Sequence, residues 1–403
     1  MKSIKELYRI GHGPSSSHTM GPRRAAELFR DRHGDAKSFR VSLYGSLAAT
    51  GKGHLTDTAI VEVLQTVAPT TIVWHPEIVL PFHTNGMDFE ALNSNGEPTE
   101  EWRVYSIGGG ALSDGNPDAT WQPAEIYELN TISEIMAWCR KTGKTFWEYV
   151  EEREPSDVWD YLAEVWKTMQ QAVRNGLEHE GVLPGCLHLR RKATTYYYRS
   201  QGAKPSLQSR GLVFAYALAV SEENAAGGQI VTAPTCGSCG VLPAVLYHLA
   251  QTREFSDKRI LRALATAGLF GDAVKQNASI AGAEVGCQGE VGVACAMAAA
   301  AANQLFGGSI SQIEYAAEMG LEHHLGMTCD PICGLVQIPC IERNAYAAAR
   351  ALDVNLYSTF SDGQHRISFD KVVQVMKQTG KDIPSLYKET SEGGLAKIEL
   401  DNN

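Results

Sequence analysis

The run Val291-Gly-Val-Ala-Cys-Ala-Met-Ala-Ala-Ala-Ala-Ala302 is the longest stretch of small apolar residues in the chain. Alanine has the highest helix propensity, so the run predicts a helix. It is too short to span a bilayer, which takes about 20 residues. A helix that is apolar on every face belongs in a protein interior. The run therefore predicts a tightly packed, buried helix.

The sequence on both sides of this run also has helical character. Beyond residue 180 alanine, leucine and glycine dominate, and no strand pattern is visible. Amphipathic spacing predicts helices over 131–153 and 156–176, with Ser or Thr near their starts. Further helices are predicted over 209–221, 240–252, 256–275, 289–306, 310–320, 339–352 and 368–379.

The first third of the chain has a mixed pattern. Residues 38–47 are typical of a strand, and residues 56–68 have helical spacing. Short strands are predicted over 71–74, 77–80 and 102–107. A chain of 403 residues exceeds the usual size of one hydrophobic core. We therefore expect an α/β (α+β) domain over 1–150 followed by a larger all-α domain over 151–403.

Composition excludes several classes of protein. The net charge is −10, whereas nucleic-acid binding needs a basic surface. The N-terminal MKSIKELYRIGHG lacks the apolar core and cleavage site of a signal peptide, and no run is long enough to span a membrane. With no export signal and an odd number of cysteines, the chain is expected to be cytoplasmic, with no nucleic-acid or membrane partner.

The cysteines are clustered in the second half of the chain. There are nine, and seven of them lie close together: Cys236, Cys239, Cys287, Cys295, Cys329, Cys333 and Cys340. In a cytoplasmic protein such clustering indicates metal ligation or redox chemistry rather than disulfides. Any one of them could equally be a small buried apolar residue. As a set they point to a metal or redox site.

The first of four glycine-rich segments is Gly11-His-Gly-Pro-Ser-Ser-Ser-His18-Thr-Met-Gly-Pro22, which leads into a predicted helix over 23–29. Hydroxyls and backbone amides at a helix N-terminus favour an anion such as a carboxylate. A simple capped loop is the alternative. The candidate substrate-binding residues here are Ser15, Ser16, Ser17 and Thr19.

The second segment places Lys52 between Gly51 and Gly53, with His54 directly after them, just beyond a predicted strand. Histidine can act as a general acid or base near neutral pH, and His54 is the preferred base. His18 and Lys52 are the other catalytic candidates, and a surface loop is the alternative. The string at 49–53 lacks the GxxxxGK[ST] pattern, so a phosphate loop is rejected.

Two later segments bring cysteines to predicted helix edges. A helix is predicted to begin after the segment Thr232-Ala-Pro-Thr-Cys236-Gly-Ser-Cys239-Gly240. Binding of the substrate or of a cluster is favoured here over a redox pair or a zinc site. Thr235 is a candidate substrate-binding residue. Cys287, Cys329 and Cys340 are separated by 42 and 11 positions. Three thiolates can hold three irons of a [4Fe–4S] cluster and leave the fourth iron as a Lewis acid. This spacing alone is not diagnostic.

Taken together, these segments resemble the iron–sulfur L-serine dehydratases. The matching strings are GPSSSHTMGP, LYGSLAATGKGHLTD, TAPTCGSCGVLPAVL, GAEVGCQGEVGVACAMA and HLGMTCDPICGLVQIPCIERNA. The resemblance implies an allosteric-type N-terminal domain, a helical catalytic domain and a homodimer. It also implies cluster ligation by Cys287, Cys329 and Cys340, and a site role for Asn85. Cys236, Cys239 and Cys333 stand where many relatives have other residues, so their roles stay open.

The resemblance and the residues predict one mechanism. The substrate is L-serine, the serine-rich loop holds its carboxylate, and His54 removes the Cα proton. Aminoacrylate then forms and hydrolyses to pyruvate and ammonia. No cysteine follows Cys340, and Cys333 is expected to pack as a small apolar group. The fourth iron is therefore expected to be open to water or a small anion.

Three other functions are weighed against this mechanism. A pyridoxal phosphate dehydratase would need a Schiff-base lysine, and neither Lys192 nor Lys275 has a suitable setting. Cysteine desulfidation could use the same fold. A non-enzymatic amino-acid or redox sensor could use the same thiols.

Overall fold

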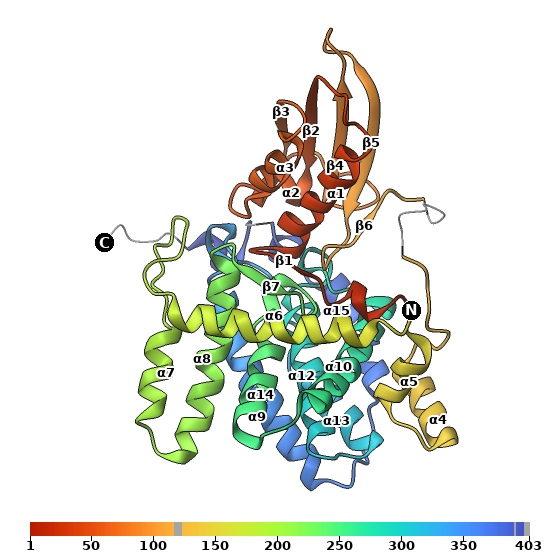
Figure 1. Cartoon of the computed structure of the whole chain (residues 1–403), viewed down its shortest axis with the longest axis vertical. Coiled ribbons are helices and arrows are strands. Elements are labelled where there is room, and N and C mark those ends of the chain that lie inside the picture. The colour runs from red at the N-terminus through yellow and green to blue at the C-terminus, as the bar shows by residue number, and fades with distance from the viewer. Residues whose placement is uncertain (117–122, 391, 399–403) are drawn as a thin grey trace.

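The computed structural model describes residues 1–116, 123–390 and 392–398. Its N-terminal part is a small sheet with helices, which stands on a larger body of packed helices (Figure 1). The predicted fold class, an α/β (α+β) part followed by a larger all-α part, is confirmed. No helix among the described residues is long and apolar enough to cross a membrane.

The strands are β1 (Ile10–His12), β2 (Ser38–Tyr44), β3 (Thr70–His75), β4 (Gly86–Leu92), β5 (Pro98–Ser106), β6 (Leu112–Ser113) and β7 (Gln229–Val231). The α-helices are α1 (Gly21–Arg30), α2 (Gly45–Thr50), α3 (Thr56–Leu64), α4 (Ile132–Thr142), α5 (Phe146–Arg153), α6 (Val158–Glu178), α7 (Ala193–Gln201), α8 (Pro205–Ala225), α9 (Val241–Arg253), α10 (Asp257–Asn277), α11 (Gly282–Val285), α12 (Val291–Leu305), α13 (Ile310–Glu322), α14 (Cys340–Phe360) and α15 (Phe369–Asp382). The short helices are η1 (Ile4–Glu6), η2 (Ser16–Met20, π-helical), η3 (Cys236–Ser238), η4 (Cys287–Gly289), η5 (Ile332–Gly334), η6 (Ser385–Tyr387) and η7 (Gly394–Lys397).

The alanine-rich helix α12 lies at the centre of the helical part, as the sequence predicts. Every residue of α12 except Gln304 is buried. It contacts α9, α10, α13 and α14, which surround it (Figure 1). Small side chains let these helices approach closely: a Cβ on Gly320 of α13 would lie only 3.0 Å from the backbone of Ala296. The interior is therefore close-packed around α12, and a larger residue at position 320 has no space.

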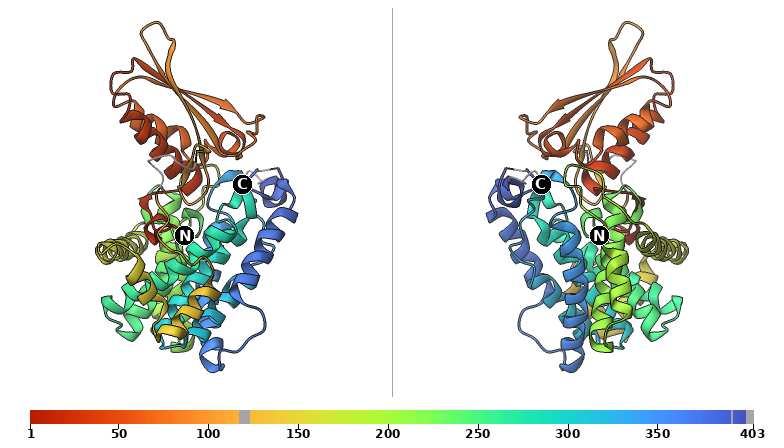
Figure 2. Two further views of the ribbon diagram at one scale, coloured as in Figure 1. Left: turned by 90° about the vertical axis from the view of Figure 1, so that its right-hand side faces the viewer. Right: turned by 90° about the vertical axis from the view of Figure 1, so that its left-hand side faces the viewer.

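The N-terminal sheet has the strand order β3-β2-β4-β5-β6, in which only the β2–β3 pair is parallel. In β2 the side chains alternate, and Phe39, Val41 and Leu43 are buried. They pack with α1 and α3, which cover one face of the sheet (Figure 2). This period-two burial is typical of a sheet with one covered face.

Two chain segments connect the sheet part to the helical part. The first residues of the chain belong to the helical core, where Met1, Ile4 and Tyr8 are buried. Strand β1 then pairs with β7 of the helical part, with Ile10 opposite Val231. The chain returns to the helical core at Tyr127. The serine-rich loop after β1 therefore lies at the junction of the two parts.

Some expectations from the sequence are wrong in detail. The helix predicted over 131–153 is two helices, because Gly143 adopts φ +73° and ends α4. Residues 77–80 are not a strand, and β4 and α7 were not predicted. The short β7 is a strand beyond residue 180, where none was expected. The domain boundary at 150 stays a prediction, although α4 and α5 pack in the helical core.

Candidate active site at the junction

The glycine-rich segments of the sequence meet where the sheet part joins the helical part. Across this junction Cys236 Sγ lies 3.3 Å from Met20 Sδ, at the end of η2. Ser46 Oγ of α2 donates to the carbonyl oxygen of Glu389, near the C-terminus, at 3.1 Å. Segments that are far apart in sequence therefore form one site.

The serine-rich loop is ordered by its own side chains. Ser15 caps η2, and its Oγ accepts from the backbone N–H of His18 at 3.1 Å. Ser17 Oγ lies 2.9 Å from His18 Nδ1, and His18 Nε2 lies 3.3 Å from the carbonyl oxygen of Ser46. A carbonyl can only accept, so Nε2 of His18 donates and Nδ1 accepts from Ser17. Both ring nitrogens of His18 are therefore engaged, whereas the Ser16 hydroxyl has no partner among the described residues.

His54 differs from His18 in having one free nitrogen. Its Nδ1 lies 3.1 Å from the carbonyl oxygen of Thr50, so Nδ1 carries the proton and Nε2 the lone pair. Nε2 is buried without a hydrogen-bond partner in the described part of the chain. Burial lowers the pKa of His54 to about 4, so the ring is neutral near pH 7. The two imidazole centroids are 4.6 Å apart, and burial and then His54 lower the pKa of His18 well below its ordinary value.

The other two candidates of the sheet part have different positions. Asn85 is fully buried, and its Nδ2 donates to the carbonyl oxygen of Ser106 at 3.3 Å. Its Oδ1 has no partner among the described residues, so it is a buried acceptor. Lys52, in contrast, is exposed, and its ammonium lies 5.7 Å from the centre of the Trp74 ring. The structure does not bring Lys52 to the site.

On the helical side, Cys287, Cys329 and Cys340 are buried at the ends of helices or in a loop. Ligand atoms of Cys287, Cys329 and Glu290 all lie within 4.8 Å of one another. Thr235 Oγ1 donates to Glu290 Oε1 at 2.7 Å. Thr235 is therefore at the site, but its partner here is this carboxylate.

Glu389 is a site residue that sequence reasoning missed. Its backbone N–H donates to the carbonyl oxygen of Cys329 at 2.6 Å, and its Oε1 lies 3.8 Å from His18 Nδ1. Burial, and next the Cys287 thiol, raises the pKa of Glu389 to about 8. Its segment, YKETSEGG, is polar and glycine-rich like the other site segments, and that similarity was the available signal.

The structure corrects two expectations about the cysteines. Cys333 is exposed and forms a disulfide with Cys186, so it is not packed as a small apolar group and the thiols are not all free. Cys333 is the middle residue of η5, and its φ of +55° is a left-handed conformation inside this short helix. Cys236 and Cys239 are buried free thiols.

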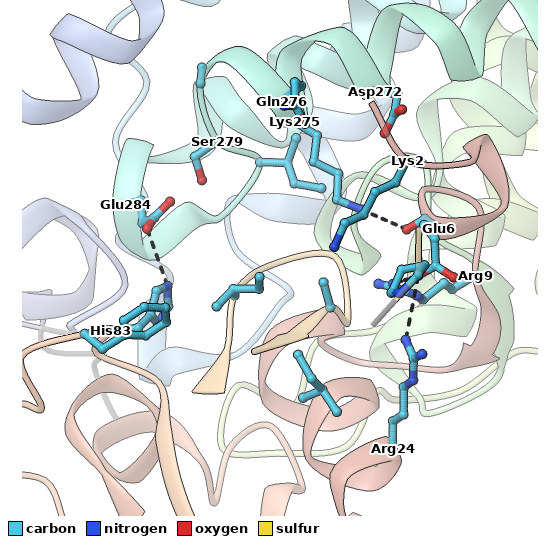
Figure 3. Close-up of a pocket in the computed structure, with 17 residues that line it drawn as sticks. Lys2, Glu6, Arg9, Arg24, His83, Asp272, Lys275, Gln276, Ser279 and Glu284 are labelled. Atoms are coloured by element: carbon cyan, nitrogen blue, oxygen red, sulfur yellow. Dashed lines mark hydrogen bonds and ion pairs between the residues drawn. The ribbon is translucent and has the colours of Figure 1, made fainter. Parts of the chain in front are cut away.

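A cavity of about 360 Å³ borders the site along the same junction (Figure 3). At one end Arg9 donates to the carboxylate of Glu6. At the other end His83 Nε2 lies 3.5 Å from Glu284 Oε1. His83 also accepts from the backbone N–H of Asn85 at 3.0 Å, so the cavity and the site share a wall.

Comparison with known proteins agrees with this architecture. The family model for the serine dehydratase alpha chain matches residues 90–396, and that for the beta chain matches residues 3–73 and 62–116. The chain is 41% identical to the L-serine dehydratase of Streptomyces coelicolor, over 98% of both chains. It is 40% identical to L-serine dehydratase 1 of Escherichia coli, over the whole of both chains. The chain belongs to the serine dehydratase family. It joins the alpha- and beta-chain regions of that family in a single polypeptide.

The thiols of this serine dehydratase family member have the chemistry of metal ligands. Cys287 and burial raise the pKa of Cys329 well above its ordinary value, and burial, with Cys287 next, does the same for Cys340. Buried thiols this close together cannot all ionise without a cation between them, and a metal displaces their protons. The guanidinium of Arg343 lies beside Cys287 and Cys340. The residues present therefore fit an anionic metal–sulfur cluster.

Proposed function

We propose that the chain eliminates water from L-serine to give pyruvate and ammonia, using a [4Fe–4S] cluster held by Cys287, Cys329 and Cys340. The observation that carries the proposal is the meeting of these buried thiols with the His18–His54 pair and the serine-rich loop at one junction. The full-length similarity to L-serine dehydratases supports the choice of substrate. When bound, the cluster supplies a Lewis acid that polarises the departing hydroxyl group.

The residues of the sheet part bind and orient the substrate in this proposal. The Ser16 hydroxyl and the amides at the start of η2 hold the carboxylate of serine, while Ser15, Ser17 and Thr19, whose side chains bond within the loop or to His54, keep the loop in place. The free Oδ1 of Asn85 accepts from the ammonium group. These groups are buried at the junction, and the exclusion of water strengthens each polar contact.

His54 is the proposed general base. Its Nε2 is unprotonated, buried and without a partner in the described chain. A substrate carboxylate next to the ring raises the pKa of His54 from its low value, because a negative charge favours imidazolium. His18, fixed at both nitrogens, acts as a positioning residue beside it.

The test is an anaerobic purification with iron and sulfide counting, followed by a pyruvate assay on L-serine. We expect four irons and four sulfides per chain and steady pyruvate formation. Serine turnover without iron would refute the cluster mechanism, and no turnover by cluster-loaded protein would refute the substrate. A parallel assay for sulfide release from L-cysteine separates dehydration from desulfidation.

A pyridoxal phosphate mechanism has little support in the geometry. Lys192 is paired with Glu342 at 3.3 Å, and Lys275 Nζ donates to the carbonyl oxygen of Glu6 at 3.0 Å. Neither lies in the loop cluster of the site. Absorbance of the purified protein distinguishes a broad iron–sulfur shoulder from an aldimine band.

Replacing Ser16 by alanine is expected to lower kcat/KM about ten- to hundredfold and to leave the iron content unchanged. The loss of one hydrogen bond to a charged group costs about 1.5–3 kcal/mol. Ser15→Ala, Ser17→Ala and Thr19→Ala are expected to lower kcat/KM as well, because these side chains hold the loop: Ser15 caps η2, Ser17 bonds His18, and Thr19 donates to the carbonyl oxygen of His54. Ser209→Ala, whose hydroxyl bonds His248 on α9, is the control. Unchanged kcat/KM in all four loop variants would make the loop purely structural.

Two further proposals concern the setting of the enzyme. By resemblance to its family we propose that it works as a homodimer. We also propose that it works in the cytoplasm. Size-exclusion chromatography with light scattering tests the first, and cell fractionation tests the second.

A further inference from the structure

The carboxylate of Glu290 lies among the cluster cysteines. Its Oε2 is 3.9 Å from Cys287 Sγ and 3.9 Å from Cys329 Sγ. Its Oε1 accepts from Thr235 Oγ1 at 2.7 Å. Because Thr235 fixes one oxygen, the other is presented to the two sulfurs.

Two glycines make the space that Glu290 occupies. A Cβ at Gly282 would lie 2.7 Å from Glu290 Oε2 and 3.1 Å from Cys329 Sγ. A Cβ at Gly237 would lie 3.1 Å from Glu290 Oε1. Contacts below 3.0 Å force a shift, so a side chain at 282 would displace the carboxylate or the sulfur. The backbone around Glu290 is therefore shaped to admit a carboxylate between the thiols.

The cysteines of the chain leave the fourth position of a four-iron cluster without an evident thiolate. Cys333 is exposed and bonded to Cys186. Cys139 and Cys295 are in the interiors of α4 and α12. Cys236 and Cys239 are the other two free thiols: Cys236 Sγ contacts Met20 Sδ at 3.3 Å, and Cys239 is buried at the end of η3.

We propose that Glu290 is the fourth protein ligand of the cluster in the resting enzyme, binding through Oε2 in place of the water or small anion expected from the sequence. The inference rests on the proposed function, because it needs the three-cysteine cluster. A carboxylate is a harder ligand than thiolate and binds soft iron–sulfur sites less tightly. Glu290 therefore retains the fourth iron between turnovers and gives up its place when serine binds.

The experiment compares wild type with Glu290→Gln, both reconstituted with ⁵⁷Fe under anaerobic conditions. We measure the Mössbauer spectrum and the rate of iron loss to a chelator, without substrate. Glutamine has the shape of glutamate but no charge. We expect Glu290→Gln to lose one iron per cluster at least tenfold faster and to show an altered signal for that iron only. Cys236→Ala is expected to match wild type in both measurements.

A second variant keeps the test decisive if Glu290→Gln does not fold. Glu290→Cys offers a thiolate from the same position, and we expect a four-iron cluster that loses iron more slowly and whose signal serine no longer perturbs. The proposal would be overturned if Glu290→Gln had the same Mössbauer spectrum and the same rate of iron loss as wild type. It would also be overturned if only Cys236→Ala altered the signal of the fourth iron. A Glu290→Cys protein whose signal serine still perturbs would also overturn it. In these cases an active, cluster-loaded wild type would leave the proposed function intact, whereas a wild type without iron would refute both.

Discussion

Replacing Cys287, Cys329 or Cys340 by serine is expected to abolish both the cluster and the turnover of L-serine. A hydroxyl is a poor ligand for iron, and the two remaining thiols cannot hold the cluster alone. The loss should be complete within detection for each single variant, because the ligands act as a unit. Iron and sulfide counts, the visible absorbance shoulder and a pyruvate assay measure it on protein purified without oxygen.

Two other cysteines are the matched controls for this experiment. Cys139 is buried in α4, and Cys186 is exposed in a disulfide with Cys333. Cys139→Ser and Cys186→Ser should keep both the colour and the activity. A circular dichroism melt shows whether a ligand variant has lost its fold as well as its iron. A colourless wild type with full activity would contradict the assignment of the three cysteines.

The sequence predicts the helical part well because its signals are local. The alanine run leaves no charged side chain for a surface, and α12 is accordingly surrounded by helices. Thr131 and Ser309 begin helices with capping boxes, and a capping box is a local signal because it lies within four consecutive residues. The break at Gly143 was missed because the apolar spacing continues across it.

Strand β4 was missed for a different reason. Its buried residues Met87, Phe89 and Ala91 alternate with Asp88 and Glu90, as in a half-buried strand, but Gly, Asp, Glu and Ala have low β-propensity and hide this pattern. Its stability comes from β2 and β5 on either side, which are tertiary partners. Strands β1 and β7 pair although they are far apart in sequence, and each has only three residues, which is too short to show a periodic pattern.

The candidate site also contains residues that local motifs predict and residues that only tertiary contacts bring in. The serine-rich loop, His54 and the cysteines lie in short motifs that can be recognised in the sequence, and their roles in the site stay predictions. The contacts of Glu290 with Thr235 and of Glu389 with His18 join residues far apart in sequence. Lys52 shows what a sequence motif cannot predict, which is the direction of each side chain. His54, two residues away, is buried, whereas the exposed Lys52 ammonium lies over the Trp74 ring.

Replacing His54 by alanine or glutamine is expected to keep the cluster and to lower kcat by about 10²–10⁴, the usual contribution of a general base. The same variants should stop exchanging the Cα hydrogen of serine with deuterated water, which mass spectrometry of the recovered substrate measures.

The form of His54 that acts as a base is the neutral ring, and burial lowers the pKa of His54 to about 4. Protonation of His54 in the free enzyme therefore removes activity only as the pH falls toward that value, and near neutral pH the base is present in full. His18→Gln should disturb kcat less, because both nitrogens of His18 already have partners. Near-normal exchange in His54→Gln would assign the base elsewhere, and among the remaining candidates the exposed Lys52 is the less favoured because its ammonium lies over Trp74.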